Sequence, residues 1–495
     1  MFIELDTFAK GTNVDCDICI VGAGAAGISM ALEFANSNYQ VILLESGGME
    51  YQQDTQTLNK GRITGLKYVP LENARLRFFG GTTNHWAGQS TPLEPIDFQN
   101  RDWIADGGWP IEYKEYAQYL PRAQTVCKLG TTPFDQELWA DKFDSPFEDN
   151  NFQPVIFRYP NPITRFGQAY RDDIANGDNI RCILNANATN LIQNDDDSIN
   201  HIQVNSLSGN AIHVKAKSYV LASGCIQNVK LLMNSNQKYA EGIGNKHDQL
   251  GRYFMEHPNY DTGEVYFSDN ANVSSLTKPK TQLDGSEVRL DFQLTAEEQK
   301  KHKILNHSVF FVHKPHPQKK FDDGIVGTIS KYWKKIENKL DLNTEPERYK
   351  MRIRLEHAPI KDSRVELDKE QDALGMYNVK LNIKMGELES KTISTLQMEV
   401  AKLLGANNVG RMKIDFNGGT EWQKDVGWQY HHFGGTRMHD SPEKGIVDSD
   451  CKVHGVNNLF IASSSVFPTS GHANPTLNIV ALTLRLADHL KRTVS

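Results

Sequence analysis

Residues 17–47, DICIVGAGAAGISMALEFANSNYQVILLESG, constrain the fold of this 495-residue chain more than any other segment. An apolar run leads into a glycine-rich turn, an amphipathic stretch follows, and a second apolar run, QVILLE, ends at Glu45. Apolar runs of this length without polar alternation are typical of strands buried on both faces of a parallel sheet. The order therefore predicts a strand, a crossover helix and a second, parallel strand.

The glycines of the turn, Gly22, Gly24 and Gly27, have the spacing G-x-G-x-x-G. In this context the first glycine allows a tight turn, the second lets the backbone approach a pyrophosphate, and the third lets the helix pack closely on the strand. Free N–H groups at the helix N-terminus favour phosphate binding. Glu45 can accept hydrogen bonds from a ribose diol and would repel a 2′-phosphate. These residues predict an adenine dinucleotide site without distinguishing FAD from NAD.

Strands of the same kind recur far along the chain. SYVLASG begins at residue 218 and NLFIAS at residue 458, and the second is followed by a loop and a long amphipathic stretch. A dinucleotide fold assembled from such distant pieces is discontinuous in sequence. We expect an α/β fold, α+β overall, with a Rossmann-like domain interrupted by an inserted, sheet-based substrate domain.

Composition limits the classes of partner. At 39% hydrophobic and 23% charged, the chain is typical of globular proteins, and its length predicts two or more domains. A net charge of -7 gives no reason to expect nucleic acid or an anionic membrane surface as a partner. The sequence has no run of about 18 apolar residues, which argues against membrane insertion.

Cysteine usage and the first residues bear on the compartment. Six cysteines are too few for a disulfide scaffold, and MFIELDTFAK lacks the features of a secretion signal, so we expect a cytoplasmic protein. Cys16 and Cys19 have a C-x-x-C spacing. Residues three apart on a strand point to opposite faces, so this pair is interpreted as part of a buried strand rather than as a redox or zinc motif.

Two further segments carry polar groups suited to chemistry. RLRFFGGTTNHWAGQS, residues 75–90, is rich in glycine, which lets a backbone press against a flat ring system. HHFGGTRMHD, residues 431–440, places adjacent histidines before a glycine turn. Neighbouring side chains on an extended segment point apart, which disfavours a metal site, whereas a neutral imidazole is well suited to accept a hydroxyl proton. We therefore expect no metal.

Near the C-terminus, SGHANPTLNIV sets Asn474 directly before Pro475. This order predicts a helix that starts at the proline with the asparagine as its N-cap. His472 is expected in the preceding loop, where it could line a substrate pocket.

The ensemble resembles the glucose-methanol-choline family of FAD oxidoreductases, and within it the bacterial branch similar to pyranose oxidases and sugar dehydrogenases. GGTTNHWAG is similar to the family's flavin-loop motif, and LGRYFMEHP and DSRVELDKEQDALGMYNVKL are similar to segments that link its lobes. HHFGGTRM and HANPTLNIVALTLRLAD are the most specific matches. The resemblance implies FAD, a two-lobed fold and oxidation of a small-molecule alcohol, most simply a carbohydrate.

The resemblance also implies roles for individual residues. His432 would be the base, with His431 the candidate should the register slip by one, and Asn474 would be its partner at the reacting carbon. The start of the last helix would face the flavin. Adenine contacts are expected near Ala188, and FAD attachment through His85 is an alternative to a noncovalent contact. Together with the glycine turn and Glu45, the implied cofactor-binding residues are Gly81, Thr82, Asn84, His85, Ala188, Pro475 and Thr476.

The predicted lobes alternate along the chain. FAD-binding parts are expected at 1–95, 180–258 and 420–495, and substrate-domain parts at 96–179 and 259–419. KYWKKIENKL, residues 331–340, predicts a short amphipathic helix. A sterol or other apolar-alcohol oxidase and a catalytically silent flavin-binding protein remain alternatives to oxidation of a sugar, polyol or glycoside. The sequence does not identify the substrate or the electron acceptor.

Overall fold

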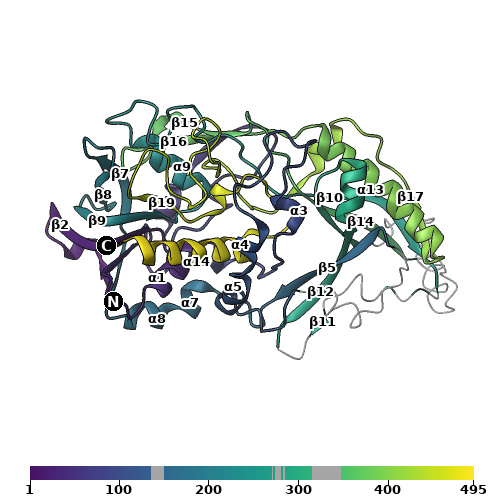
Figure 1. The fold of residues 1–495 in the computed structure, drawn as a ribbon, viewed down its shortest axis with the longest axis horizontal. Helices are drawn as coiled ribbons and strands as arrows, with labels where there is room; N and C mark the ends of the chain where they lie inside the picture. Colours follow the sequence, from purple (N-terminus) through teal and green to yellow (C-terminus); the bar gives the residue numbers. More distant parts are fainter. Residues whose placement is uncertain are drawn as a thin grey trace, which may run out of the picture.

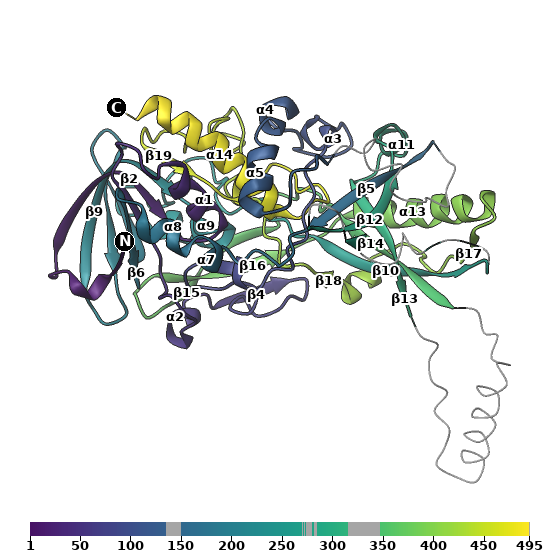
Figure 2. The same cartoon turned by 90° about the horizontal axis from the view of Figure 1, so that it is seen from below.

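The computed structural model describes residues 1–134, 150–269, 271, 273, 280–281, 285–314 and 347–494, and these residues form two large sheets at opposite ends of the molecule (Figures 1 and 2). The N-terminus and the C-terminus both lie on the side of the molecule that holds the first sheet. The predicted helix at 331–340 lies outside the described residues.

The first sheet is largely parallel and contains the predicted strand, helix and strand. Its order is β1 (Phe2–Glu4), β6 (Ile180–Leu184), β3 (Val41–Leu44), β2 (Thr12–Val21), β9 (Ala211–Leu221), β8 (Ile199–Asn205) and β7 (Asn187–Gln193), and β19 (Leu459–Ile461) pairs with β9. The pairs β1–β6, β6–β3, β3–β2, β2–β9 and β9–β19 are parallel. Strands from the start, middle and end of the chain thus share one sheet, which confirms the discontinuous Rossmann-like fold.

Helices cover this sheet and continue its core. α1 (Ala25–Glu33) packs against α14 (Pro475–Thr493), and α14 also packs against α5 (Leu120–Cys127). In α14 the residues Leu477, Val480, Ala481, Leu484 and Ala487 are buried. Their spacing of three or four residues places them on one face of the helix, which explains why this segment folds as an amphipathic helix against the core.

The second sheet is mainly antiparallel. Its order is β11 (Lys280–Thr281), β12 (Glu287–Leu294), β13 (His307–His313), β14 (Arg348–Leu355), β10 (Pro258–Phe267) and β17 (Gly410–Lys413), with β5 (Phe152–Tyr159) on β12 and β18 (Gly427–Trp428) on β10. α13 (Glu387–Ala406) buries Ile393, Leu396, Val400 and Leu403 in the same apolar cluster as these strands. The second sheet therefore has a core of its own.

Smaller elements join the two ends. β15 (Arg364–Gln371), β16 (Tyr377–Ile383) and β4 (Gly61–Gly65) form a third sheet. Within the described ranges, the remaining helices and 3-10 turns are η1 (Leu5–Thr7), α2 (Gln53–Thr57), η2 (Gly81–Asn84), α3 (Pro95–Phe98), α4 (Tyr113–Ala117), α7 (Phe166–Ala169), α8 (Arg171–Asn176), α9 (Cys225–Asn234), α11 (Ala296–His302), η3 (Glu421–Asp425) and η4 (Ser464–Val466).

Segment 96–179 contributes to both ends of the molecule. β5 joins the second sheet, whereas α5 packs on α14 and α8 packs on β6 beside the first sheet. Segment 259–419 likewise supplies β15 and β16, which pair with each other, and β16 also pairs with β4. The domain bounds drawn from the sequence stay a prediction.

A buried ion pair connects the segment after α3 to the end of β14. Arg101 Nη1 and Nη2 donate to the two carboxylate oxygens of Glu356 at 2.7 and 2.6 Å, and the side chains are 1% and 0% exposed. Glu356 also accepts the backbone N–H of Asn306 at 2.8 Å. Both charges are thus buried and paired with each other.

Breaking this pair is expected to lower the free energy of unfolding by about 3–5 kcal/mol, because Glu356→Gln leaves a buried guanidinium without its counter-charge. The midpoint of urea unfolding measures the loss. Glu298→Gln is the matched control, because its partner Lys301 is 66% exposed and such pairs contribute about 1 kcal/mol or less. Equal shifts in the two variants would contradict the prediction.

Candidate active site

A cavity of about 460 Å³ lies at the carboxyl ends of the parallel strands of the first sheet. It is bordered by Val21 and Leu44 at the ends of β2 and β3, by Ala222 after β9 and by Ala462 after β19. Open α/β sheets bind ligands at this edge. Of the residues predicted from the sequence, the cavity lining includes Gly22, Gly24, Glu45, Gly81, Thr82, His85, Ala188, His432, Asn474, Pro475 and Thr476.

The three glycines of the turn are required for different reasons. Gly22 has a φ of 107°, and a Cβ there would lie 2.8 Å from the Ala222 carbonyl oxygen. A Cβ on Gly27 would lie 1.7 Å from the Gly22 carbonyl oxygen, so this glycine allows helix-to-turn packing and does not border the cavity. A Cβ on Gly24 would meet no described atom within 4 Å. The space beside Gly24 therefore fits a dinucleotide pyrophosphate that approaches the backbone.

Glu45, directly after β3, forms hydrogen bonds that hold the glycine turn in place. Its carboxylate accepts the backbone N–H of Ala23 and that of Gly47, both at 2.9 Å. Burial raises the pKa of this carboxyl, although these donors oppose the shift. Oε1 also accepts the Ser46 hydroxyl at 3.2 Å, whereas Oε2 keeps a second lone pair that can accept a hydrogen bond from a ribose hydroxyl.

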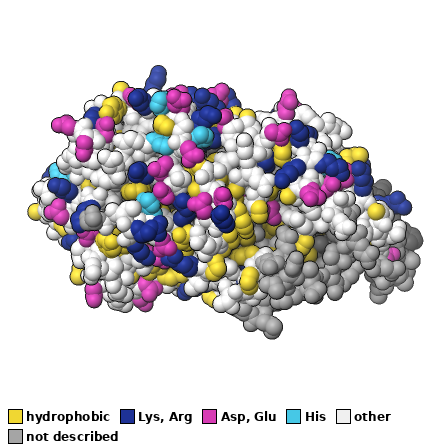
Figure 3. Space-filling model, in the orientation of Figure 1, with side chains coloured by type: hydrophobic (Ala, Val, Ile, Leu, Met, Phe, Trp, Pro, Cys, Tyr) yellow, Lys and Arg dark blue, Asp and Glu magenta, His cyan; other side chains and the backbone are white. Residues whose placement is uncertain are grey.

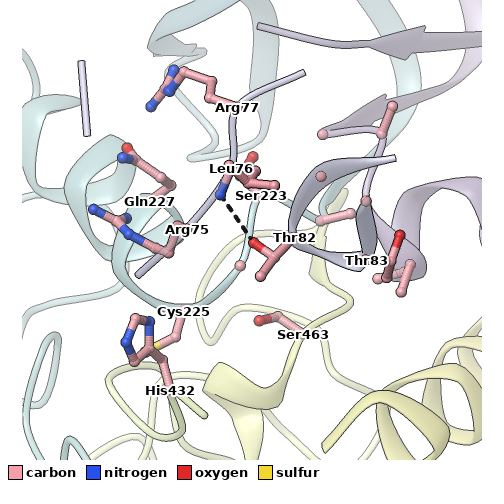
Figure 4. A pocket seen from close by; sticks show the side chains of 18 of the residues that line it. Arg75, Leu76, Arg77, Thr82, Thr83, Ser223, Cys225, Gln227, His432 and Ser463 are labelled. Carbon is pink, nitrogen blue, oxygen red and sulfur yellow. Dashed lines mark hydrogen bonds between the residues drawn. The ribbon is translucent and has the colours of Figure 1, made fainter. Parts of the chain in front are cut away.

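Segment 76–89 folds over the opposite side of the turn. Leu76 donates its N–H to Thr82 Oγ1 at 3.2 Å (Figure 4), and a Cβ on Gly81 would lie 3.1 Å from Gly24 Cα. His85 follows η2 and borders the cavity, where burial and then Arg165 lower its pKa. Asn84 differs from the other predicted residues, because its amide donates to the Phe79 carbonyl at 2.9 Å and is not part of the cavity lining.

Two arginines that the sequence analysis did not single out line the cavity beside Gln227 (Figure 4). Arg77 donates to Asn59 Oδ1 at 3.2 Å and to Asn187 Oδ1 at 3.3 Å. Burial lowers the pKa of Arg75 to about 10, which leaves it charged at neutral pH. These two arginines give the cavity a positively charged edge that suits an anionic cofactor. The two arginines of RLRFFGG could have indicated this edge from the sequence.

His432 is 7% exposed at the base of the cavity near Cys225 (Figure 4). Its Nε2 lies 2.8 Å from the hydroxyl of Tyr68, a residue 364 positions earlier in the chain. Burial and the charge of Arg75 lower the pKa of His432 to about 3. The imidazole is therefore neutral at physiological pH and can act as a proton acceptor.

The neighbouring His431 is held by a second set of contacts. Glu256 is fully buried, and its carboxylate accepts the backbone N–H groups of His257 at 2.8 Å, His431 at 2.7 Å and Tyr430 at 3.1 Å. His431 Nδ1 lies 3.1 Å from His257 Nδ1. Glu256 and His257 belong to LGRYFMEHP, a segment that the sequence analysis noted. Its contact with His431 could not be predicted from the sequence.

Asn474 stands directly before α14, as predicted, and Pro475 is the first residue of that helix. The prediction that its side chain caps the helix is wrong, because no cap hydrogen bond forms. Within the described residues its buried Oδ1 has no partner, and the side chain borders the cavity. His472 precedes it in the loop and is 1% exposed, outside the cavity lining. The Asn474 side chain is thus available to a ligand.

Other kinds of site find no support in the described part of the chain. Across those ranges no group of three or more histidine, cysteine or acidic side chains is arranged to hold a metal ion. None of the described helices has the length and apolar character needed to cross a membrane. Figure 3 shows basic and acidic side chains interspersed over one face of the molecule.

Comparison with known proteins finds a family match in the C-terminal part of the chain. Residues 359–483, which include His432 and Asn474, match the model of the GMC oxidoreductases. This part of the chain is similar to that family. The GMC oxidoreductase match thus covers the part of the chain that supplies the catalytic candidates.

Full-length similarities agree with this match. The chain is 23% identical to the fructose dehydrogenase large subunit of Gluconobacter japonicus, over 96% of this chain and 98% of the relative. It is 21% identical to the 2-methyl-1,2-propanediol dehydrogenase of Mycolicibacterium austroafricanum, over 97% and 96%. Among solved structures, a formate oxidase superposes with a TM-score of 0.62 over 98% and 99% of the two chains at 16% identity, which shows a shared fold.

Proposed function

We propose that this protein is a GMC oxidoreductase that uses FAD to oxidise a CH–OH group of a sugar, polyol or glycoside to a carbonyl. The observation that carries the proposal is the shared cavity, where the glycine turn and Glu45 meet His432 and Asn474. A dinucleotide site alone would suit many redox enzymes. A neutral imidazole borders the same cavity as an amide oxygen that has no partner among the described residues, and this combination favours chemistry on an alcohol.

The cavity residues divide into those that would hold the cofactor and those that would meet the substrate. Gly22, Gly24 and the N-terminus of α1 would hold the pyrophosphate, Glu45 a ribose, and Ala188 on β7 the adenine. Gly81, Thr82, His85, Pro475 and Thr476 would contact the remaining part of the cofactor. Attachment of FAD through His85 is the alternative to a noncovalent contact.

The chemistry divides between cofactor and protein. FAD would supply a hydride acceptor when bound. His432 would accept the proton of the hydroxyl group, because its lowered pKa keeps the imidazole neutral at physiological pH. Asn474 would orient the carbinol by hydrogen bonding. Because Asn474 stands before α14, the positive end of that helix would also favour negative charge that develops nearby.

Polar side chains support a hydroxylated substrate rather than a sterol. Gln89 borders the cavity, and among the described residues its buried Nε2 has no partner. His431 and Asn474 add further polar groups to the lining of this cavity. The relatives named for fructose and for a propanediol point the same way. From the sequence we also propose a cytoplasmic location.

The test is a visible absorption spectrum of the purified protein, followed by anaerobic addition of sugars, polyols and sterols in separate cuvettes. We expect a flavin spectrum that bleaches with a sugar or polyol and not with a sterol. Colour that stays with the acid-precipitated protein would indicate attachment through His85. Absence of flavin after attempted reconstitution, or a flavin that no alcohol reduces, would refute the proposed function.

A further inference from the structure

His431 and His257 form a pair whose protonation can be worked out from their contacts. His257 Nε2 lies 2.8 Å from the carbonyl oxygen of Gly471. A carbonyl oxygen only accepts hydrogen bonds, so the hydrogen of His257 resides on Nε2. Burial lowers the pKa of His257 to about 3, and the charge of Arg354 adds to this effect. The ring is therefore neutral, and its Nδ1 carries a lone pair.

The protonation of His431 follows from that of His257. Their Nδ1 atoms lie 3.1 Å apart with the rings nearly perpendicular, at 87°. Because His257 Nδ1 is an acceptor, His431 Nδ1 must carry the donated hydrogen. Burial, His257 and Arg354 lower the pKa of His431 well below its ordinary value, so this ring is neutral too. Its Nε2 is consequently left with a lone pair and no hydrogen.

This lone pair is not used by the described part of the protein. His431 borders the cavity beside His432 and Asn474, and it keeps partial solvent access. Across the described residues, its polar contacts are the Nδ1 contact with His257 and the backbone N–H bond to Glu256. By contrast, His432 Nε2 already has the Tyr68 hydroxyl at 2.8 Å. The two adjacent histidines therefore present different hydrogen-bonding groups.

The backbone around the pair is fixed as well. Glu256 Oε1 accepts the N–H groups of both His257 and His431, so one buried carboxylate sets the positions of both residues. Tyr430, directly before His431, has a φ of 61°, a left-handed conformation that is uncommon for a tyrosine. A costly conformation persists only where surrounding contacts impose it. These contacts indicate that the direction of the His431 ring is built into the fold.

We propose that His431 is a substrate-binding residue whose Nε2 accepts a hydrogen bond from a second hydroxyl group of the substrate, one that is not oxidised. His257 and the Gly471 carbonyl are positioning groups that hold His431 in the required tautomer. The inference rests on the proposed function and narrows the class of substrate. The enzyme would prefer compounds with at least two hydroxyl groups over the corresponding monoalcohols.

The kinetic test uses the best sugar or polyol of the panel and its monodeoxy analogues. In the parent enzyme, one analogue should lose about tenfold in kcat/KM, because it lacks the donor to His431. His431→Phe should lose about the same factor on the full substrate and should no longer distinguish that analogue. His313→Phe, an exposed histidine outside the cavity lining, is the control and should behave as the parent.

A second readout does not depend on turnover. Nitrogen-15 spectra of the histidine-labelled holoenzyme distinguish Nδ1–H from Nε2–H rings, and the signals lost in His431→Phe identify this residue. We expect a neutral ring with hydrogen on Nδ1. In His257→Phe we expect the Nε2–H form to appear, with loss of discrimination against the same analogue.

The outcomes separate this inference from the function on which it rests. If the parent enzyme reduces its flavin with no alcohol, the proposed function has failed. If it oxidises alcohols but His431→Phe and the parent discriminate equally among the analogues, only the role of His431 is wrong. An Nε2–H ring in the parent enzyme, or loss of flavin reduction with every alcohol in His431→Phe, would also overturn it.

Discussion

Replacing Gly24 by aspartate is expected to abolish FAD binding while leaving the empty protein at least as stable as the parent. A Cβ at Gly24 meets no described atom within 4 Å, and its φ of -86° is accessible to any residue. Aspartate is also a favoured N-cap, and Gly24 is the N-cap of α1. A carboxylate there would face the pyrophosphate, and two like unit charges about 4 Å apart repel by about 4 kcal/mol near a protein surface.

That repulsion corresponds to a loss of about a thousandfold in affinity. The ratio of flavin to protein absorbance measures cofactor content, and thermal unfolding of the cofactor-free proteins measures stability. Gly24→Asn controls for bulk without charge and should lose less affinity. Gly27→Ala should instead destabilise the cofactor-free protein, since its Cβ would lie 1.7 Å from the Gly22 carbonyl oxygen. A yellow Gly24→Asp protein with full flavin content would contradict the assignment of this turn.

The glycine turn was predictable because its determinants are local. The apolar runs, the glycine spacing and the terminal acid lie within residues 17–47, and the structure pairs Ile18 with Val41 in the parallel register that they imply. The start of the last helix at Pro475 was predictable for the same reason, since proline fits the first helical position.

The contacts of the histidines were not predictable, because they depend on tertiary packing. Tyr68 reaches His432 across 364 positions, and Glu256 reaches His431 across 175. No periodicity in either segment specifies these pairings. Tyr68 and Glu256 both lie in segments outside the helices and strands, where periodicity carries no information.

At Asn474 the start of the helix was predicted correctly from the sequence, but the hydrogen bonding of the side chain was not. Propensity places asparagine before a helix because its side chain usually caps the first turn. Here the Asn474 backbone carbonyl accepts from Asn478 Nδ2 at 2.9 Å, while the side chain borders the cavity without capping. A residue that forgoes a favourable local bond beside a cavity is a candidate for a functional role, which sequence propensity alone would have hidden.

His432→Ala is expected to slow reduction of the flavin by a substrate alcohol by about 10²–10⁴-fold, the usual contribution of a positioned general base. Stopped-flow mixing of the oxidised holoenzyme with substrate under anaerobic conditions measures this step directly. Tyr68→Phe is the informative companion, because it removes the hydroxyl at 2.8 Å from Nε2 and keeps the imidazole. The rate of flavin reduction should fall far less in Tyr68→Phe than in His432→Ala.

The pH dependence of the same step gives an independent test. With a pKa of about 3, His432 stays unprotonated throughout the pH range in which the protein is handled, so the rate should not fall near pH 6.5 as it would for an exposed histidine. The stability effect has a definite sign. Since the folded pKa lies below the unfolded value, the unfolded chain binds the proton first, and stability is lost as pH falls from about 6.5 toward 3. His432→Ala should lack this pH-dependent contribution to stability. A fall in the rate of flavin reduction near pH 6.5, or an unchanged rate in His432→Ala, would assign the proton acceptor to another group.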